Sequence, residues 1–480
     1  MAAAAVISVE ETRQSFAKTR ARQQLHADLD GWLERLETNR PDDTPSLEAL
    51  PPTVCAMRQE LTGRIPQALV AQQHARVLHQ RTMPCPHGHC LLPARPTQPR
   101  TVPTMVGEVS RSRPYFDCSH GQHGCSPLDD VLQRSERRTP WDLQKAGARL
   151  AAEVPFQTAQ GLFRELTGLP LSDHTLHEVT GELSHAVGVL EVSPTAAEMA
   201  HRVAEVAAGK PWRPVMVLAI EGACVPTRPA HAKGPAPGRR HTRAHRAGWQ
   251  GEGKEAKGFR VYLVDQERMV PVVSWHQVQT DEEVAEALRQ VNAAGLIPED
   301  QVRLCGLGDG AKWIWQQVSA IFPPAVQILD DYHGREHVHQ VAGLPCGDDA
   351  EQEHAWVEAM MARLFWGDVD WAIEGWEALQ PRHSQAAEEI RKRIGFLRNS
   401  AERLHDRAAR KGGYPIGSGG IEAANTCISH VRLKRSGAWW YIEQANRMLA
   451  LRCAVDNGTF ARVFETSKRR VLQRHQGNPL

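Results

Sequence analysis

The sequence has no long hydrophobic run. No stretch of about 18 or more apolar residues occurs, so we expect no membrane-spanning helix. The N-terminal stretch "MAAAAVISVEETRQSF" lacks the basic segment of a secretory signal peptide, and its apolar run is too short for one, so we expect a cytoplasmic protein. The chain has 480 residues, of which 41% are apolar and 24% charged. These values are typical of a soluble protein of about two to four domains.

An excess of charge of one sign is also lacking, because the formal net charge is only +1. Positive charge is nevertheless concentrated locally. Residues 228–257 contain eight Lys or Arg against two acids, and the tail at 466–480 is also basic. Such clusters can neutralise phosphates, although a solvated flexible loop is at least as common an explanation.

The ten cysteines are not expected to form disulfides in a cytosolic chain. Within residues 81–127, "CPHGHC" and "CSHGQHGC" flank a stretch that alternates like a hairpin with its turn near Gly107. This pattern predicts a zinc-ribbon-like module with a structural Zn²⁺ bound by Cys85, Cys90, Cys118 and Cys125. The spacings C-x4-C and C-x6-C are wider than usual, and four unliganded thiols are the alternative. The histidines inside the pairs could replace a cysteine: His87, His89, His120 and His123.

Two further segments are expected to be helical. Residues 1–80 are expected to form a helical N-terminal module, and the sequence indicates no role for it. Residues 128–210 contain a helix to about Thr167, the turn "GLPLS", and a second helix that Ser172 or Asp173 can cap. This arrangement is typical of a helix-turn-helix DNA-binding region, although other helical hairpins fit equally well.

From residue 211 to 465 the pattern is α/β. Strands are expected at 215–221, 258–264, 269–275, 302–309 and 325–331, with helices after the third and the fourth. This order is that of a ribonuclease-H-like core. A helical insertion is expected at 345–412.

Three carboxylates stand where such a core carries its catalytic acids: Glu221, where the first strand is expected to end, Asp309 and Glu422. Each has a glycine nearby, which lets the backbone approach a metal or a phosphate. Three converging carboxylates can hold two Mg²⁺ or Mn²⁺ ions about 4 Å apart for phosphoryl transfer. Taken singly, Asp309 could be a turn residue before Gly310, and Glu422 could serve a helix N-terminus.

The motif "HGREH" places His333, Glu336 and His337 on one face of a helix. Its order is an inverted form of the H-E-x-x-H zinc motif, and no further zinc ligand is evident. A hydrolytic zinc centre in a metallohydrolase unrelated to DNA is therefore the lesser alternative. A hydrogen-bonded network at the edge of the acid site is favoured.

From about residue 80 to 460 the sequence resembles bacterial insertion-sequence transposases of the ISKra type, which are distantly related to Mutator-like eukaryotic elements. The resemblance is carried by the Cys pairs around "GEVSRSRPYFDC" and by "GDGAKWIW", "LDDYHGREHV" and "GSGGIEAANTCISHVRLKRSGAWWYIEQANRMLALR". It implies a DDE catalytic core with a helical insertion, an N-terminal DNA-binding region, and metal-dependent cleavage and strand transfer at element ends.

Position by position, Asp309 matches the second acid and Glu422 the third, and Asp330 and His333 match an Asp-x-x-His of the family. The first acid differs, because the family strand ends in Asp-Gly and this one in Glu221 and a glycine. A misplacement on the order of 1 Å can cost about 10²-fold in rate. A catalytically impaired, transposase-derived DNA-binding protein is therefore the alternative.

The resemblance also implies partners. They are double-stranded DNA, as the terminal inverted repeats and the target, and further copies of the chain in at least a dimer on DNA. The location would then be the cytoplasm in association with the nucleoid. The basic residues expected to contact DNA are Arg239, Arg240, Arg243, Arg246, Arg432, Lys434 and Arg435.

Overall fold

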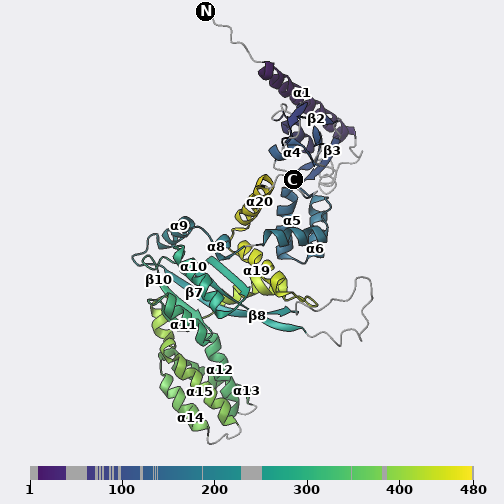
Figure 1. Cartoon of the computed structure of the whole chain (residues 1–480). Coiled ribbons are helices and arrows are strands. Elements are labelled where there is room, and N and C mark those ends of the chain that lie inside the picture. The colour runs from purple at the N-terminus through teal and green to yellow at the C-terminus, as the bar shows by residue number, and fades with distance from the viewer. Residues whose placement is uncertain are drawn as a thin grey trace, which may run out of the picture. The chain divides into compact units, whose positions relative to one another are not determined.

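The computed structural model describes residues 9–38, 62–70, 74, 77, 80–85, 88, 91–95, 99–118, 123–132, 135, 137, 139–185, 187–228, 251–346, 349–380 and 386–477 (Figure 1). In these ranges, no helix has the length and apolarity needed to cross a membrane. The chain forms two compact units. One comprises Met1–Leu150, Phe156–Val179 and Glu465–Leu480, and the other comprises Ala151–Pro155 and Thr180–Phe464.

The first unit contains a four-stranded antiparallel sheet in the order β1-β2-β5-β6 and a separate hairpin of β3 and β4. The strands are β1 Thr82–Pro84, β2 Leu91–Arg95, β3 Pro99–Thr104, β4 Gly107–Ser112, β5 Tyr115–Cys118 and β6 His123–Cys125. The expected turn near Gly107 is present, and Gly107 adopts a φ of 125°, which favours glycine. Phe116 and Leu92 form the small buried core of the four-stranded sheet with Cys85 and Cys118.

The helices of the first unit include the two that were expected to form a helix-turn-helix. The helices are α1 Val9–Thr38, residues 62–70, α4 Pro127–Val131, α5 Trp141–Glu153, α6 Phe156–Thr167 and α7 Asp173–Leu183, of which α5 and α7 continue into the second unit. α6 ends at Thr167 as expected, and Ser172 Oγ accepts the N–H of Thr175 at 3.1 Å, which caps α7. α7 itself carries Asp173, Glu178 and Glu182 and no Lys or Arg, a composition that does not favour contact with phosphates.

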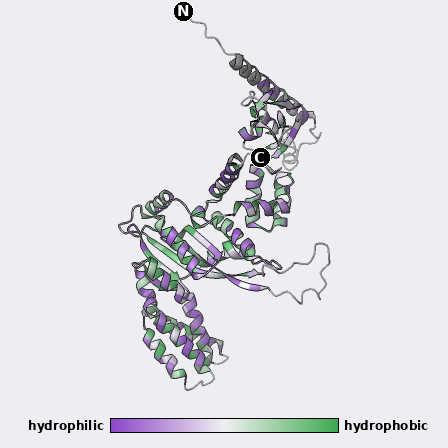
Figure 2. Ribbon diagram, viewed as in Figure 1, coloured by the Kyte–Doolittle hydropathy of each residue, from purple (hydrophilic) through white to green (hydrophobic). Residues whose placement is uncertain are grey.

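The second unit is built on a five-stranded mixed sheet in the order β11-β10-β7-β8-β9. The strands are β7 Val215–Thr227, β8 Glu252–Asp265, β9 Arg268–Val278, β10 Arg303–Gly308 and β11 Val326–Leu329. β7, β10 and β11 are mutually parallel, and β8 is antiparallel to both β7 and β9. The helices α10 Asp281–Ala293 and α11 Lys312–Ile321 provide the crossovers. Figure 2 shows the hydrophobic colour on the central strands, where residues 215–220 are all buried.

β7 differs from the expected strand, because it does not end at Glu221 but continues to Thr227. β8 likewise begins at Glu252 instead of residue 258, and the two strands pair along their whole length. The extension buries Ala223 and Val225 and exposes Cys224 between them. This alternation is too short, and too close to a proline, to predict a strand. Glu221 therefore lies within a strand and not at its tip.

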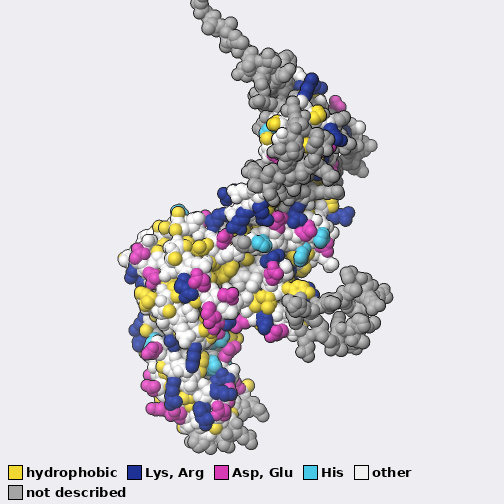
Figure 3. All heavy atoms as spheres, in the orientation of Figure 1, with side chains coloured by type: hydrophobic (Ala, Val, Ile, Leu, Met, Phe, Trp, Pro, Cys, Tyr) yellow, Lys and Arg dark blue, Asp and Glu magenta, His cyan; other side chains and the backbone are white. Residues whose placement is uncertain are grey.

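A helical bundle follows β11. Its helices are α12 Asp331–Cys346, α13 Ala350–Trp366, α14 Val369–Leu379, α15 Ala387–Ser400, η3 Ala401–Arg403 and α16 Asp406–Lys411. Figure 1 shows α12 to α15 side by side, with a shared interior of buried residues such as Val338, Val357, Trp376 and Leu397. Figure 3 shows basic and acidic side chains interspersed over the surface of this bundle.

The remaining helices close the second unit around the sheet. They are α8 Val189–Val192, α9 Ala196–Ala207, α17 Gly419–Ala424, the π-helical η4 Asn425–His430, α18 Val431–Leu433, α19 Ile442–Asp456 and α20 Phe460–Gly477, whose last part belongs to the first unit. α19 packs on β9. At its end, the Asn457 side chain accepts from the N–H of Ser274 at 2.7 Å and donates to the carbonyl of Val192 at 2.9 Å. These bonds join α19 to β9 and to the end of α8.

Candidate active site

Glu221 is the innermost of the predicted acids. It lies in β7 opposite Gly258 of β8, and its Oε2 atom is buried without a hydrogen-bond partner among the described residues. Burial raises the pKa of Glu221 to about 7, the positive charge of His333 opposes this, and the negative charges of Glu422 and Asp309 add to it. An ionised Glu221 therefore lacks the compensation that a buried carboxylate needs.

Asp309 follows the end of β10, the neighbour of β7 in the sheet. Its Oδ1 accepts the N–H of Ala311 at 2.9 Å, and Gly310 between them has a φ of 94°. This is the turn before Gly310 that the sequence indicated as the alternative to a catalytic role for Asp309. The turn and the acid cluster are compatible, because the charge of Asp309 acts on both Glu221 and His333.

Glu422 lies in the first turn of α17 and is exposed. Its Oε1 accepts a hydrogen bond from Ser418 Oγ at 2.5 Å, and Ser418 is the residue before the helix. The helix thus holds its acid against its own N-terminal end, where a negative charge is favourable. The charge of Glu422 also acts on Glu221, as that of Asp309 does, and we call these three residues the acid cluster.

Asp330 and His333 lie between the segments that carry these acids. Asp330 is 0% exposed; its Oδ1 accepts the N–H of Ser418 at 2.7 Å, and its Oδ2 pairs with His333 Nδ1 at 2.7 Å. Burial alone would raise the pKa of Asp330, but the hydrogen bonds from His333 and Ser418 outweigh it and lower the pKa. The same bond, against the effect of burial, raises the pKa of His333 to about 9. His333 is therefore an imidazolium at neutral pH, next to the acid cluster.

The donor set of this cluster fits a hard divalent cation, because it consists of carboxylate oxygens and includes the unpartnered Oε2 of Glu221. In the side-chain arrangement described, however, no three His, Cys, Asp or Glu side chains of the described residues stand together as the ligands of one ion. Binding of Mg²⁺ or Mn²⁺ by Glu221, Asp309 and Glu422 therefore stays a prediction.

The sequence did not single out Ser418 or Arg260, which also position this site. Arg260 in β8 is 5% exposed, and its guanidinium donates to Ser274 Oγ at 2.9 Å and to the carbonyl of Gly420 at 3.1 Å, and pairs with Asp456 at 2.5 Å. It thereby holds the start of α17. A charged residue inside the apolar run "GFRVYLV" was the available signal, because arginine is almost never fully buried without partners.

Gly420 fixes how closely α17 approaches the sheet. A Cβ atom at this position would lie 2.6 Å from Tyr262 Cε1 and 2.8 Å from the sulfur of Met269. Any side chain here would move α17, and with it Glu422, away from β8 and β9.

The residues of "HGREH" do not form a zinc site in the described structure. Arg393 donates to His337 Nδ1 at 2.9 Å, and the His337 ring stacks on Phe396 with centroids 3.6 Å apart. Burial, followed by the charges of Arg393 and His333, lowers the pKa of His337 to about 4. Glu336 is exposed. The contacts favour the interpretation of a bracing network over that of a zinc centre.

Three of the four predicted zinc-binding cysteines lie together in the first unit. Cys85 and Cys118 are buried in one small core, and Cys125 packs against it with its Sγ 3.5 Å from the sulfur of Met83. Burial raises the pKa of Cys125, and the charges of Asp130 and Cys85 add to the shift. Cys90, His87, His89 and His120 lie outside the described residues, as does the side chain of His123.

The predicted DNA-contacting residues fall into three groups. Arg239, Arg240, Arg243 and Arg246 lie outside the described residues. Lys434 and Arg435 are exposed, as DNA contact requires. Arg432 is only 3% exposed, its Nε donates to the carbonyl of Ala151 at 2.9 Å, and its guanidinium lies 5.1 Å from the ring centre of Trp440. This placement corrects the expectation for Arg432, which has an internal structural role.

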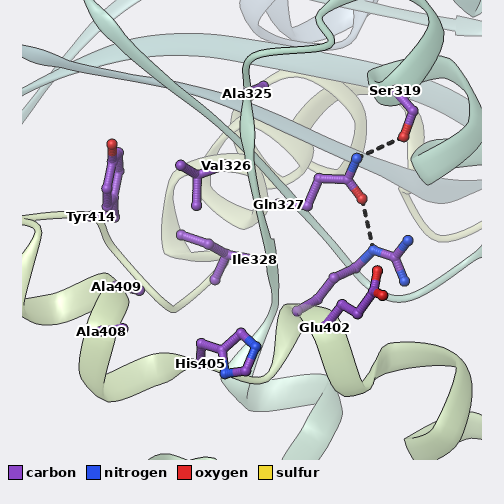
Figure 4. A pocket seen from close by; sticks show the side chains of 11 residues that line it. Ser319, Ala325, Val326, Gln327, Ile328, Glu402, His405, Ala408, Ala409 and Tyr414 are labelled. Atoms are coloured by element: carbon purple, nitrogen blue, oxygen red, sulfur yellow. Dashed lines mark hydrogen bonds between the residues drawn. The ribbon is translucent and has the colours of Figure 1, made fainter.

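A cavity of about 470 Å³ lies beside β11 and is lined from α11, η3 and α16 (Figure 4). At one side, Gln327 donates to Ser319 Oγ at 2.7 Å and accepts from Arg403 Nε at 2.8 Å. Tyr414 lines the opposite side in Figure 4. None of the predicted catalytic residues lines this cavity.

No known family model and no curated protein matches the chain. Among solved structures, the Drosophila P element transposase strand transfer complex is similar at 13% identity, with 73% of this chain and 88% of that chain covered and a TM-score of 0.25. A TM-score of this size supports no conclusion about fold or function. The resemblance to ISKra-type transposases therefore rests on the sequence motifs.

Proposed function

We propose that the chain is a DNA transposase that cleaves the ends of an insertion sequence and joins them to target DNA. The observation that carries this proposal is the action of the charges of Asp309 and Glu422 on Glu221, where the three acids come from the end of β10, α17 and β7. The strand order β11-β10-β7-β8-β9, with only β8 antiparallel to the others, supports a ribonuclease-H-like core. The proposal includes binding of double-stranded terminal repeats by at least a dimer, and a structural Zn²⁺ at the cysteine cluster.

In this proposal Glu221, Asp309 and Glu422 hold Mg²⁺ or Mn²⁺, which when bound supplies activation of the attacking hydroxyl and stabilisation of the leaving oxygen. The other residues of the site position these acids. Asp330 ties the end of β11 to Ser418, which in turn holds Glu422. The imidazolium of His333 offsets part of the repulsion among the acids, and because Asp330 engages its Nδ1, Nε2 is the ring atom that can meet substrate.

The test uses the full chain and labelled DNA that carries the ends of the element flanking the gene. Glu221→Gln, Asp309→Asn and Glu422→Gln are each expected to lower metal-dependent cleavage by about 10²-fold or more, because several kcal/mol of transition-state stabilisation are lost. Glu336→Gln, which removes an exposed acid outside the cluster, is the matched control and should cleave normally. Full cleavage by any one of the three variants would refute the assignment of that acid.

A catalytically impaired DNA-binding protein is the second candidate. It is favoured by the extra methylene of Glu221 and by the unpartnered, buried Oε2 of that side chain. Glu221→Asp separates the two candidates. Cleavage by both proteins identifies a working transposase with Glu as first acid, and cleavage by the Asp variant alone identifies an impaired one. Absence of cleavage by both, with DNA binding intact, identifies a DNA-binding protein.

A further inference from the structure

A cavity of about 350 Å³ lies where β7 ends and where β8 and α19 begin. It is lined by Thr227 and Arg228 at the end of β7, by Glu252 and Lys254 of β8, and by the first residues of α19. No residue of the acid cluster lines it. All of its lining residues belong to the second unit.

Arg228 is the distinctive residue of this cavity. Its guanidinium carbon lies 3.9 Å from the ring centre of Tyr441, and its Nε is buried without a hydrogen-bond partner among the described residues. The backbone around it is fixed, because the N–H of Arg228 donates to the carbonyl of Trp440 at 2.9 Å. A planar guanidinium that is stacked on an aromatic ring is suited to bidentate binding of an anion.

The acids that line the cavity do not neutralise Arg228, because both have other partners. Glu252 pairs with Lys254 at 2.8 Å, and Glu443 pairs with Arg447 at 2.6 Å. Among the described residues, no acid forms an ion pair with Arg228.

The start of α19 brings backbone amides to the cavity, and Glu443 in its first turn offsets part of the helix dipole. α19 runs from Ile442 to Asp456, and the residue before it, Tyr441, makes no side-chain cap. The first residues of the helix, Ile442, Glu443 and Gln444, line the same cavity as Arg228. Amides in the first turn of a helix have no partner within the helix, and together with the helix dipole they attract anions.

We propose that this cavity binds a phosphate group, and that the phosphate belongs to the DNA backbone. The DNA source rests on the proposed function, whereas the phosphate chemistry does not. Arg228 directly follows the strand that carries Glu221, and the seven residue steps from Glu221 to Arg228 span at most about 23 Å. This length corresponds to about seven nucleotides of duplex rise, so the bound phosphate would fix the register of the DNA on the acid cluster.

The first arm tests the phosphate group. Inorganic phosphate is titrated calorimetrically into the full chain, into Arg228→Ala and into Arg289→Ala. Arg289 lies in α10, half exposed and paired with Glu286, so this control removes one positive charge without touching the cavity. We expect binding by the wild type and by Arg289→Ala and none by Arg228→Ala. Equal binding by all three would overturn the site.

The second arm tests the source with duplex DNA at several salt concentrations. Arg228→Ala is expected to bind about tenfold more weakly, because charge-assisted hydrogen bonds are lost. The slope of log K against log salt should fall in magnitude by about 0.9, the value for one phosphate. Arg228→Lys keeps the charge but not the planar fork, so we expect weaker binding with an unchanged slope. This variant carries the test if the alanine variant does not fold.

A neutral methylphosphonate placed at successive backbone positions locates the contact. At one backbone position, the methylphosphonate should weaken DNA binding by the wild type as much as Arg228→Ala does. DNA with the methylphosphonate at that position should bind to Arg228→Ala no more weakly than unmodified DNA does. Phosphate binding at Arg228 with unchanged DNA affinity would overturn the DNA source and assign the cavity to a free phosphate compound. If the wild type binds phosphate but no DNA, the proposed function fails while the phosphate site stands.

Discussion

His276 in β9 is a buried imidazole that the fold requires to be neutral. The side chain is 0% exposed, and neither ring nitrogen has a hydrogen-bond partner among the described residues. Burial lowers the pKa of His276 to about 3, the charge of Arg260 adds to the shift, and Asp456 opposes it. Protonation in the unfolded chain, where the pKa is about 6.5, therefore competes with folding at acid pH.

The sign of this effect gives a testable pH dependence. Because the pKa of His276 is lower in the folded state than in the unfolded state, its contribution is complete above about pH 6.5 and is lost as pH falls towards 3. The free energy of unfolding should fall by about 1.4 kcal/mol per pH unit in this window. Urea unfolding between pH 7 and pH 4.5, followed by tryptophan fluorescence, measures it. For His276→Leu, the free energy of unfolding should lack this part of the dependence on pH. If the free energy of unfolding fell with pH equally in both proteins, the expectation would be wrong.

Single residues also show where sequence reasoning stops. Asp309 and Glu422 were predicted from their motifs, because glycines and strand order mark their positions, and their catalytic role stays a prediction. The role of Arg432 was not, because its partner, the carbonyl of Ala151, is remote in sequence. Lys434 and Arg435, from the same short basic run, are exposed. Composition cannot separate these cases, because tertiary contacts decide which guanidinium is buried.

At the scale of elements, the packing of α17 on the sheet controls the position of Glu422. Gly420→Ala would place a Cβ 2.6 Å from Tyr262 Cε1, and overpacking of this kind typically costs about 1–3 kcal/mol. Because the clash moves the helix that carries Glu422, cleavage should fall by about 10²-fold. The cleavage assay and thermal unfolding measure the two effects.

The adjacent residue supplies the matched control. A Cβ on Gly419 would meet nothing within 4 Å, so Gly419→Ala should leave both cleavage and stability near the wild-type values. The packing explanation would be wrong if both variants lost activity equally, or if Gly420→Ala cleaved normally.

The centres of the elements were predictable and their ends were not. Apolar runs such as residues 215–220 locate the strands, because a strand covered on both faces needs continuous hydrophobicity. The paired extension from Glu221 to Thr227 escaped prediction, because its half-buried alternation is short and its partner strand is separated from it in sequence. The cavity beside Arg228 follows directly from this extension, so the sequence indicated Arg228 only as part of the basic stretch 228–257 and not as a residue of a cavity.

At the scale of the whole molecule, charge and chain organisation are both non-local. The net charge is +1, so the proposed binding of DNA must rest on local sites and not on the overall field. The last residues, Glu465–Leu480, belong to the same unit as Met1–Leu150. Lys145 of α5 pairs with Glu465 at 3.4 Å within this unit. A contact across the length of the chain leaves no local signature in the sequence.

The last prediction concerns metal and the stability of the full chain. If the acid cluster binds a divalent cation only when folded, Mn²⁺ at about 100 times its dissociation constant should add about 2.7 kcal/mol to the free energy of unfolding. For a unit larger than 250 residues, that gain raises Tm by roughly 4–5 °C. Differential scanning calorimetry should show this rise for the wild type and for Glu336→Gln. The combined variant Glu221→Gln, Asp309→Asn, Glu422→Gln should show little of it. An equal rise in all three proteins would mean that Mn²⁺ stabilises the chain elsewhere, and the acid cluster would lose its assignment as the metal site.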